Sequence, residues 1–145
     1  MRGLAAALVA LALGCGSRPA VDAPAARAAL IRQHLPDVAL VTHEGRAVHF
    51  YEDLVKGKVV AINFMFATCR AACPVSTQHL VEVQRALGAR AGRDVTLLSI
   101  SLDPAHDTPE VLRGYAEAHG VGPGWTFLTG SYDDVELLRH RLGVY

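Results

Sequence analysis

A chain of 145 residues is long enough for one domain with a single hydrophobic core and too short for two. Its hydrophobic content of 51% excludes a chain that is disordered throughout. Fourteen basic residues balance fourteen acidic ones, which argues against nucleic acid as a partner, because a phosphate-binding surface normally shows as a cationic excess.

The first fifteen residues have the composition of an export signal. Arg2 supplies a positive charge, and Leu4–Leu13 is an apolar run of about ten residues, a signal-peptide length too short to span a bilayer. The run ends in Leu-Ala-Leu-Gly-Cys15, which resembles a bacterial lipoprotein signal, although Ala12 stands where such signals usually have Leu. We expect residues 1–15 to be a lipoprotein-type signal peptide with Cys15 as the lipidation site; simple secretion is the alternative.

Residues 16–36 connect this segment to the rest of the chain. They contain three prolines among many alanines, a composition typical of a tether followed by a short helical or irregular stretch. We therefore expect an extracytoplasmic protein, held to a bacterial membrane in the periplasm or cell envelope by its lipid anchor. The folded domain would then occupy residues 37–145.

The next segment has the pattern of a β-hairpin. Residues 38–42 and 47–50 flank a turn-like tetrad that contains Gly45. Residues 51–56 then predict one helical turn. The nearly continuous apolar run of residues 58–66 is typical of a central strand that is covered on both faces.

The rest of the chain alternates helices and strands. Pro74 is placed as the first residue of a helix that continues to about Leu87, and residues 94–102 predict a second buried strand. Thr108, Pro109 and Glu110 provide an N-cap, a pre-set first residue and a first-turn acid for a helix.

Residues 125–128 predict a short strand, and Ser131 with Asp134 makes a weak capping-box start for a final helix. This alternation predicts an α/β fold in which helices cover the faces of a parallel sheet.

Cys69 and Cys73 follow the first long strand directly, at the edge where α/β sheets carry their functional crevice. Unpaired N–H groups at a helix N-terminus and the nearby cation of Arg70 favour thiolates, so we expect lowered thiol pKa values. Soft thiolates select Cu(I) and Zn(II) over hard cations. A purely structural disulfide between the two cysteines is a weaker explanation, because closing so short a loop removes little conformational entropy from the unfolded chain.

The spacing of the pair leaves metal binding and disulfide formation open. On a regular helix, residues four apart hold their Cβ atoms roughly 5–6 Å apart, which is wider than the roughly 3.5–4.5 Å of a relaxed disulfide. Pro74 disfavours helical geometry at Cys73, so we expect the pair in the turn before the helix. A copper site would need a further ligand, and His106 is the best candidate because its loop should end on the same sheet edge.

Three blocks of sequence carry a family resemblance: Gly57–Pro74, Ser101–Glu110 and Trp125–Gly130. They resemble the SCO/SenC family, thioredoxin-like proteins that deliver copper to, or keep reduced, the dinuclear copper centre of cytochrome c oxidase. The hallmark of this family is Cys-x-x-x-Cys-Pro after a strand, and its Asp-Pro-x-x-Asp-Thr-Pro loop is matched by Asp103–Pro109. The likeness covers most of residues 38–145.

The resemblance implies a thioredoxin-like fold with copper as its cofactor. It implies that Cys69 and Cys73 are copper ligands and a redox-active dithiol. It also implies that the partner is the copper-binding subunit of cytochrome c oxidase or another copper or thiol client.

Two departures from the family pattern affect these expectations. Arg70 and Ala72 stand where the family usually has Pro and an acidic residue, which could alter copper affinity or redox potential. The family's third copper ligand is a His on a hairpin beyond the helix that ends here near residues 142–145. The resemblance therefore implies a domain that lacks its C-terminal strands and closing helix, with an unpaired strand edge and uncovered apolar side chains.

The leading hypothesis is a membrane-tethered copper chaperone whose delivery includes redox cycling, a transfer protein rather than a turnover enzyme. The second is an extracytoplasmic thiol-disulfide oxidoreductase, in which Cys69 attacks a partner disulfide and Cys73 resolves the mixed disulfide. That class more often has two residues between its cysteines. The third is a truncated fragment that folds poorly and binds metal weakly.

Overall fold

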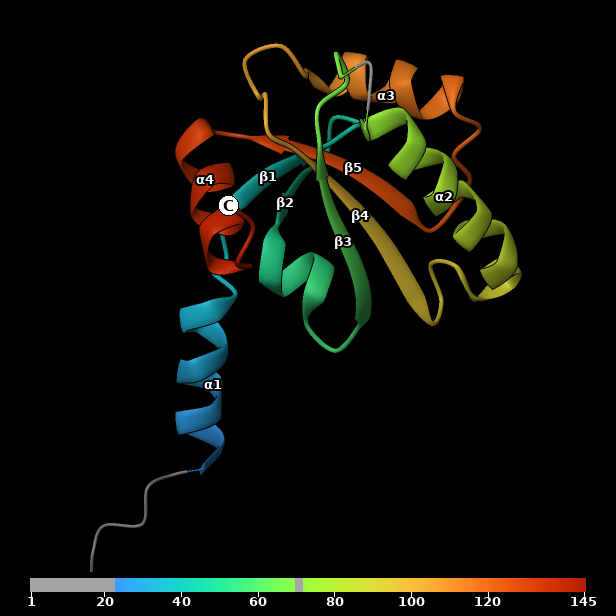
Figure 1. Ribbon diagram of the computed structural model, residues 1–145. Coiled ribbons are helices and arrows are strands. Elements are labelled where there is room, and N and C mark those ends of the chain that lie inside the picture. Colours follow the sequence, from blue (N-terminus) through green and yellow to red (C-terminus); the bar gives the residue numbers. More distant parts are fainter. Residues whose placement is uncertain (1–22, 70–71) are drawn as a thin grey trace, which may run out of the picture.

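The computed structural model describes residues 23–69 and 72–145 (Figure 1). The expected signal peptide with Cys15, the first part of the tether and Arg70 lie outside the described residues. In chain order the elements are α1 (Ala23–His34), β1 (Ala39–Thr42), β2 (Ala47–His49), the π-helix η1 (Phe50–Val55), β3 (Val59–Met65), α2 (Ala72–Leu87), the 3₁₀ turn η2 (Gly88–Arg90), β4 (Val95–Ser101), α3 (Pro109–Ala118), β5 (Trp125–Gly130) and α4 (Tyr132–Arg141).

The strands form one five-stranded sheet in the order β2-β1-β5-β4-β3. β3, β4 and β5 are parallel, as expected, which confirms the α/β class. The predicted hairpin of β1 and β2 is also present. It joins the sheet antiparallel to β5, so the sheet is mixed rather than all parallel. This pairing was not predicted, because the pairing of strands distant in the chain has no local signal.

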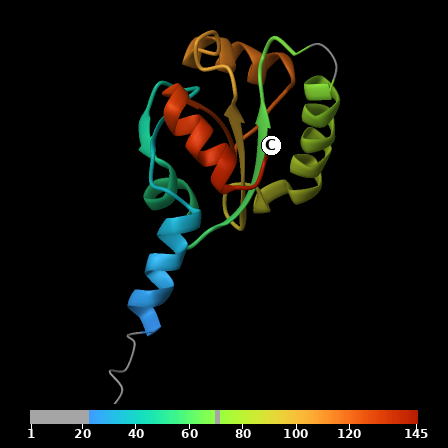
Figure 2. The same ribbon diagram turned by 60° about the vertical axis from the view of Figure 1, so that its left-hand side comes forward.

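Helices cover both faces of the sheet (Figures 1 and 2). On one face, α2 and α3 pack over the sheet through a cluster centred on Met65, Leu97 and Phe127. On the other face, η1 and α4 enclose a second cluster centred on Phe50, Ile100 and Leu138. β4 contributes to both clusters and is the most deeply buried strand.

β3 was expected to be a central strand covered on both faces, and this expectation is wrong. Within the described residues β3 pairs only with β4, so it lies at the edge of the sheet. Val59 is 64% exposed, and Ile62 and Phe64 line an open cavity of about 320 Å³. An apolar run indicates that both faces of a strand are apolar, but it does not show whether the strand has a hydrogen-bonded neighbour on each edge. The uncovered apolar strand edge inferred from the resemblance is therefore found at β3.

Two of the predicted helix starts are confirmed by their caps. The Thr108 hydroxyl accepts a hydrogen bond from the Val111 N–H at the start of α3, and Ser131 accepts one from the Asp134 N–H at the start of α4. The predicted helical turn is present as η1. These signals are local, so the sequence was sufficient to find them.

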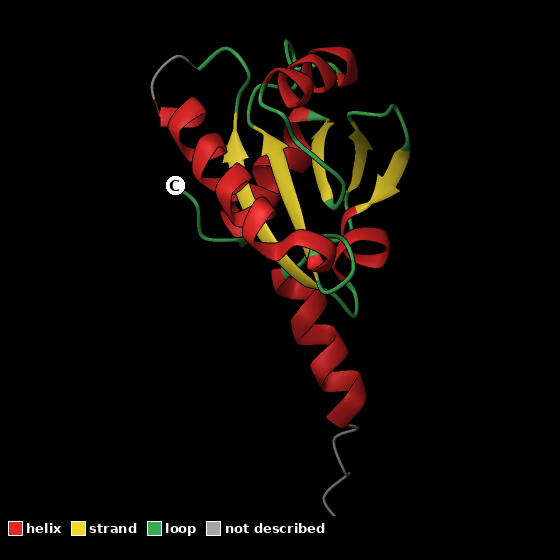
Figure 3. Ribbon diagram, turned by 90° about the vertical axis from the view of Figure 1, so that its right-hand side faces the viewer, coloured by secondary structure: helices red, strands yellow, loops and turns green. Residues whose placement is uncertain are grey.

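α1 extends away from the rest of the molecule and leads back toward the undescribed N-terminal residues (Figure 3). In the part of the chain that the structure describes, no helix combines the length and the apolar character needed to cross a bilayer.

Gly124 lies immediately before β5, where its backbone crosses that of Gly92. Its φ is +83°, and an added Cβ would lie 2.3 Å from the Gly92 nitrogen and 2.4 Å from the Ala91 carbonyl carbon. We expect Gly124→Ala to lower the free energy of unfolding by about 2 kcal/mol or more, through strain and overlap with backbone atoms. The matched control is Gly114→Ala in the exposed middle of α3, where nothing lies within 4 Å. It should raise stability by about 0.5–1 kcal/mol. Denaturant unfolding of both variants measures the difference, and equal effects would contradict this account.

Candidate functional site

Cys69 follows the end of β3 and Cys73 lies at the start of α2, at the carboxyl edge of the sheet where the segments after β3 and β4 meet. The backbone of Leu102, just after β4, donates a hydrogen bond of 2.8 Å to the Met65 carbonyl at the end of β3. This contact joins the segment that carries the cysteines to the segment Asp103–Pro109. The two blocks that the sequence singled out are therefore neighbours in space.

Cys69 and Cys73 lie on either side of the start of α2. The Cys69 N–H donates to the Phe66 carbonyl at 3.1 Å, which closes a tight turn after β3. The Cys69 sulfur then accepts a hydrogen bond from the Cys73 N–H, with 3.3 Å between sulfur and nitrogen. Because the first N–H groups of a helix have no partner within the helix, the Cys69 sulfur acts as a cap for α2.

The expectation that Pro74 begins the helix and that both cysteines precede it is wrong for Cys73. α2 begins at Ala72, so Cys73 is its second residue and Pro74 its third. Proline is tolerated there, because N–H groups of the first helical turn have no intrahelical acceptor to lose. The preference of the residue before proline for extended geometry is outweighed at Cys73.

Both cysteines are half-buried and in the thiol form. Cys73 packs against the apolar cluster that includes Met65, Val81 and Leu112. This burial raises the pKa of the Cys73 thiol, and its hydrogen bond with Cys69 raises the pKa further. The expected lowering by the helix N-terminus is therefore wrong for Cys73. The N–H that caps the helix is directed at the Cys69 sulfur, while the Cys73 sulfur meets apolar side chains.

Three further side chains lie on the loop and helices beside the cysteine segment and were not assigned roles from the sequence. Asp107, from the loop after β4, is fully buried and accepts a hydrogen bond from the Ala67 N–H at 3.0 Å. Tyr115 on α3 shares a 2.9 Å hydrogen bond with Thr77 on α2. Burial raises the pKa of Tyr115, and the charges of both cysteines and Asp107 contribute less. Only Asp107 could have been suspected, because it belongs to one of the matched blocks.

His106 is not brought to the cysteines. Its side chain is 75% exposed, and its Nδ1 lies 2.8 Å from a carboxylate oxygen of Asp103, which raises the pKa of His106. Across residues 23–69 and 72–145, no three His, Cys, Asp or Glu side chains form a group able to hold a metal ion. The topology places the His106 loop on the expected edge, but the ring pairs with Asp103.

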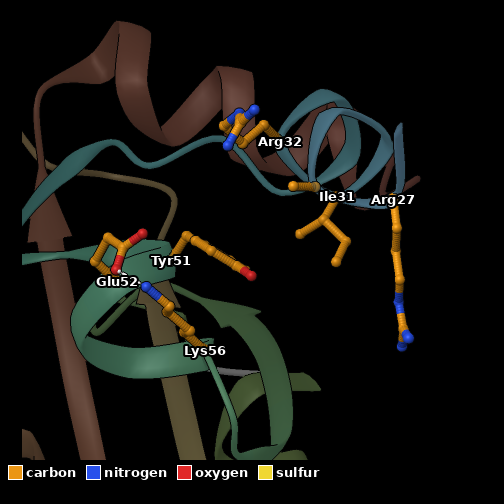
Figure 4. Close-up of a pocket in the computed structure, with 7 residues that line it drawn as sticks. Arg27, Ile31, Arg32, Tyr51, Glu52 and Lys56 are labelled. Carbon is orange, nitrogen blue, oxygen red and sulfur yellow. Dashed lines mark hydrogen bonds and ion pairs between the residues drawn. The ribbon is translucent and has the colours of Figure 1, made fainter. Parts of the chain in front are cut away.

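A cleft of about 520 Å³ lies far from the cysteines in the chain, between α1 and η1 (Figure 4). Its charged residues are Arg27, Arg32 and the exposed pair Glu52 and Lys56, which are 2.6 Å apart. No thiol or imidazole lines it, so it offers none of the soft ligands that the cysteine pair provides.

A half-buried dithiol between a parallel strand and the helix that follows it defines a thioredoxin-like dithiol protein. The SCO1/SenC family model matches residues 31–145. The chain belongs to the SCO1/SenC family.

Known relatives support this assignment. The chain is 30% identical to the SCO1 protein homolog of Bacillus subtilis over 144 residues, which are 98% of this chain and 69% of that protein. The copper-bound structure of ScoI from Bradyrhizobium japonicum has a TM-score of 0.64 and 30% identity, covering 72% of this chain and 63% of that one. Copper-bound yeast Sco1 has a TM-score of 0.63 and 30% identity, with 74% and 65% covered. The chain therefore spans about two thirds of the length of each of these relatives.

The raised pKa of Cys73 predicts its reactivity toward alkylating reagents. Because only the thiolate reacts, Cys73 should be alkylated slowly near neutral pH and reach half of its maximal rate above the ordinary thiol pKa. Because the pKa of Cys73 is raised in the folded chain, the protonated thiol stabilises the fold, and this contribution is lost as pH rises through the folded-state pKa.

The measurement is alkylation with iodoacetamide between pH 6 and pH 10, read by peptide mapping for each cysteine. A short unfolded peptide containing the Cys73 sequence is the control. Rapid labelling of Cys73 at neutral pH, at the rate of its fully ionised form, would contradict the burial argument.

Proposed function

We propose that this chain is a copper-handling dithiol protein that assists assembly of the copper centre of cytochrome c oxidase. The observation that carries the proposal is the 3.3 Å contact between the Cys69 sulfur and the Cys73 N–H, which brings two soft ligands together at one helix start. Family membership and the copper-bound relatives support it. A further structural relative, at 30% identity, is described as a member of the Sco family of cytochrome c oxidase assembly proteins.

The two thiols fit copper as cargo. Thiolates are the ligands that Cu(I) prefers, and the half-buried position of the pair limits access of water. Cys73 must lose its proton on binding, so metal uptake releases protons and strengthens as pH rises. Two protein ligands leave a coordination position accessible to a ligand from the client, which suits transfer rather than storage.

The same contact favours thiol-disulfide exchange as a second candidate function. In this reaction the Cys69 thiolate attacks a partner disulfide and releases one partner thiolate, which takes up a proton. The Cys73 thiolate then attacks the Cys69 sulfur of the mixed disulfide, forms the Cys69–Cys73 disulfide and releases the second partner thiolate. The partner is reduced by two electrons and the pair is oxidised by two. Burial of Cys73 suits its role as the later of the two nucleophiles.

We also propose that the chain is an extracytoplasmic lipoprotein, with residues 1–15 as its signal and residues 16–36 as its tether. The sequence motif that ends in Cys15 supports this assignment. α1, which lies within the proposed tether, contains no acidic residue and carries Arg27 and Arg32, which suits a position near an anionic membrane surface.

Copper titration of the reduced chain tests the main proposal. We expect one copper ion per chain with sulfur ligands seen by X-ray absorption, and a loss of binding in Cys69→Ser and in Cys73→Ser, because each removes one of two soft ligands. His106→Ala is the matched control and should keep its affinity, since His106 lies apart from the thiols.

Binding that survives both cysteine variants would refute copper binding by the pair. Efficient reduction of insulin disulfides without metal, together with weak copper binding, would favour the oxidoreductase. Weak binding without reductase activity, in a chain that unfolds without cooperativity, would favour the poorly folded fragment.

Metabolic labelling with palmitate tests the lipid anchor. Expressed in a bacterium, the chain should incorporate label and sediment with membranes, and Cys15→Ser should lose the label because the acylated sulfur is gone. Cys69→Ser is the control and should still be labelled. An intact mass that shows an unmodified Cys15 in the exported chain would refute lipidation.

A further inference from the structure

Asp107 is an unusual residue for the interior of this domain. It is fully buried, between the end of β4 and the start of α3. Its Oδ2 accepts two hydrogen bonds, from the Ala67 N–H at 3.0 Å and from the Ser101 hydroxyl at 2.5 Å. Its Oδ1 is buried and has no hydrogen-bond partner within the described residues. Burying a carboxyl group with one oxygen that makes no hydrogen bond costs free energy, which suggests that the group has a role in this fold.

The contacts of Asp107 lead directly to the cysteine pair. Ala67 is the second residue after β3, and its N–H is fixed by the Asp107 oxygen. The Phe66 carbonyl, on the other side of the same peptide bond, accepts the Cys69 N–H. One peptide unit therefore connects the buried carboxyl to the turn that places Cys69. The Cys69 sulfur in turn caps the helix that carries Cys73.

Asp107 is itself held in place from two sides. Its own N–H donates to the Asp103 carbonyl at 2.9 Å, and the following Thr108 caps α3. Ser101, the last residue of β4, is fully buried and donates to the same carboxyl oxygen that holds Ala67. The carboxyl group therefore connects the buried strand β4 to the cysteine loop.

We propose that Asp107 is a positioning residue for the dithiol, which sets the placement of Cys69 relative to Cys73 by accepting the Ala67 N–H. The proposal rests on the copper and thiol function proposed above and adds a residue to it. The oxygen that accepts the two hydrogen bonds is the feature that matters. An amide at this position retains an oxygen that accepts both, whereas a methyl group removes it.

The test compares Asp107→Ala with Asp107→Asn in the full chain. Asp107→Ala should weaken Cu(I) binding about 10–100-fold, the usual cost of losing a group that orients a ligand. Asp107→Asn should keep most of the affinity. Ser99→Ala is the matched control, because Ser99 is a buried β4 serine whose hydroxyl bonds Asn63 and Trp125 instead of the cysteine loop. It should lose stability and keep its copper affinity.

A second readout needs no metal. In glutathione buffers, the equilibrium between the dithiol and the Cys69–Cys73 disulfide should shift toward the dithiol by about tenfold in Asp107→Ala, because a less ordered Cys69 meets Cys73 less often. Asp107→Asn and Ser99→Ala should leave this equilibrium near that of the wild-type chain. This measurement keeps the two proposals distinguishable. If the wild-type chain binds no copper, the proposed function is refuted, but the disulfide equilibrium still shows whether Asp107 positions the cysteines.

Two results would overturn the proposal. One is a folded Asp107→Ala chain whose copper affinity and disulfide equilibrium match those of Ser99→Ala. The other is a folded Asp107→Asn chain that loses both properties, which would assign the effect to the charge of the carboxylate rather than to its accepting oxygen. If Asp107→Ala does not fold, Asp107→Asn still tests the accepting oxygen, because loss of both properties in a folded variant that keeps the hydrogen bonds would overturn the proposal.

Discussion

The parallel pairing of β3 with β4 is the interaction on which the site depends. The register aligns Met65 with Ser101, the last residues of the two strands. The chain then leaves each strand at the same edge of the sheet, toward Cys69 on one side and toward Asp107 on the other. Residues separated by forty positions, Ala67 and Asp107, thereby come within hydrogen-bond distance. Without this register the cysteine loop would be held only by its own turn.

The start of α2 makes the two thiols inequivalent. The helix directs one N–H at the Cys69 sulfur, and Cys73 meets the apolar cluster between α2, α3 and the sheet. A hydrogen bond to a sulfur favours its charged form, whereas burial penalises it. The two thiols therefore have different surroundings: the Cys69 sulfur accepts the N–H at the start of the helix, and Cys73 packs against apolar side chains of the fold.

Local features of this fold could be predicted from the sequence, and long-range ones could not. The caps at Thr108 and Ser131 depend on residues within one helical turn, and both were predicted. The apolar run of β3 shows that the strand has two apolar faces, but it contains no information about which strands lie beside it. The antiparallel docking of β1 on β5 was missed for the same reason. At the site, the position of the cysteine pair followed from strand and helix order, while the pKa of Cys73 depends on side chains from three separate elements.

β3 lies at the edge of the sheet and therefore has fewer neighbours than an interior strand. The cysteine loop that follows it is held instead by contacts with β4 and the loop after β4. Ala67 is bonded to Asp107, which is bonded to Ser101 at the end of β4, and β4 is buried on both faces of the sheet. The Leu102 N–H, one residue later, holds the Met65 carbonyl. The dithiol is therefore fixed to the centre of the fold through β4, and its geometry does not rest on β3 alone.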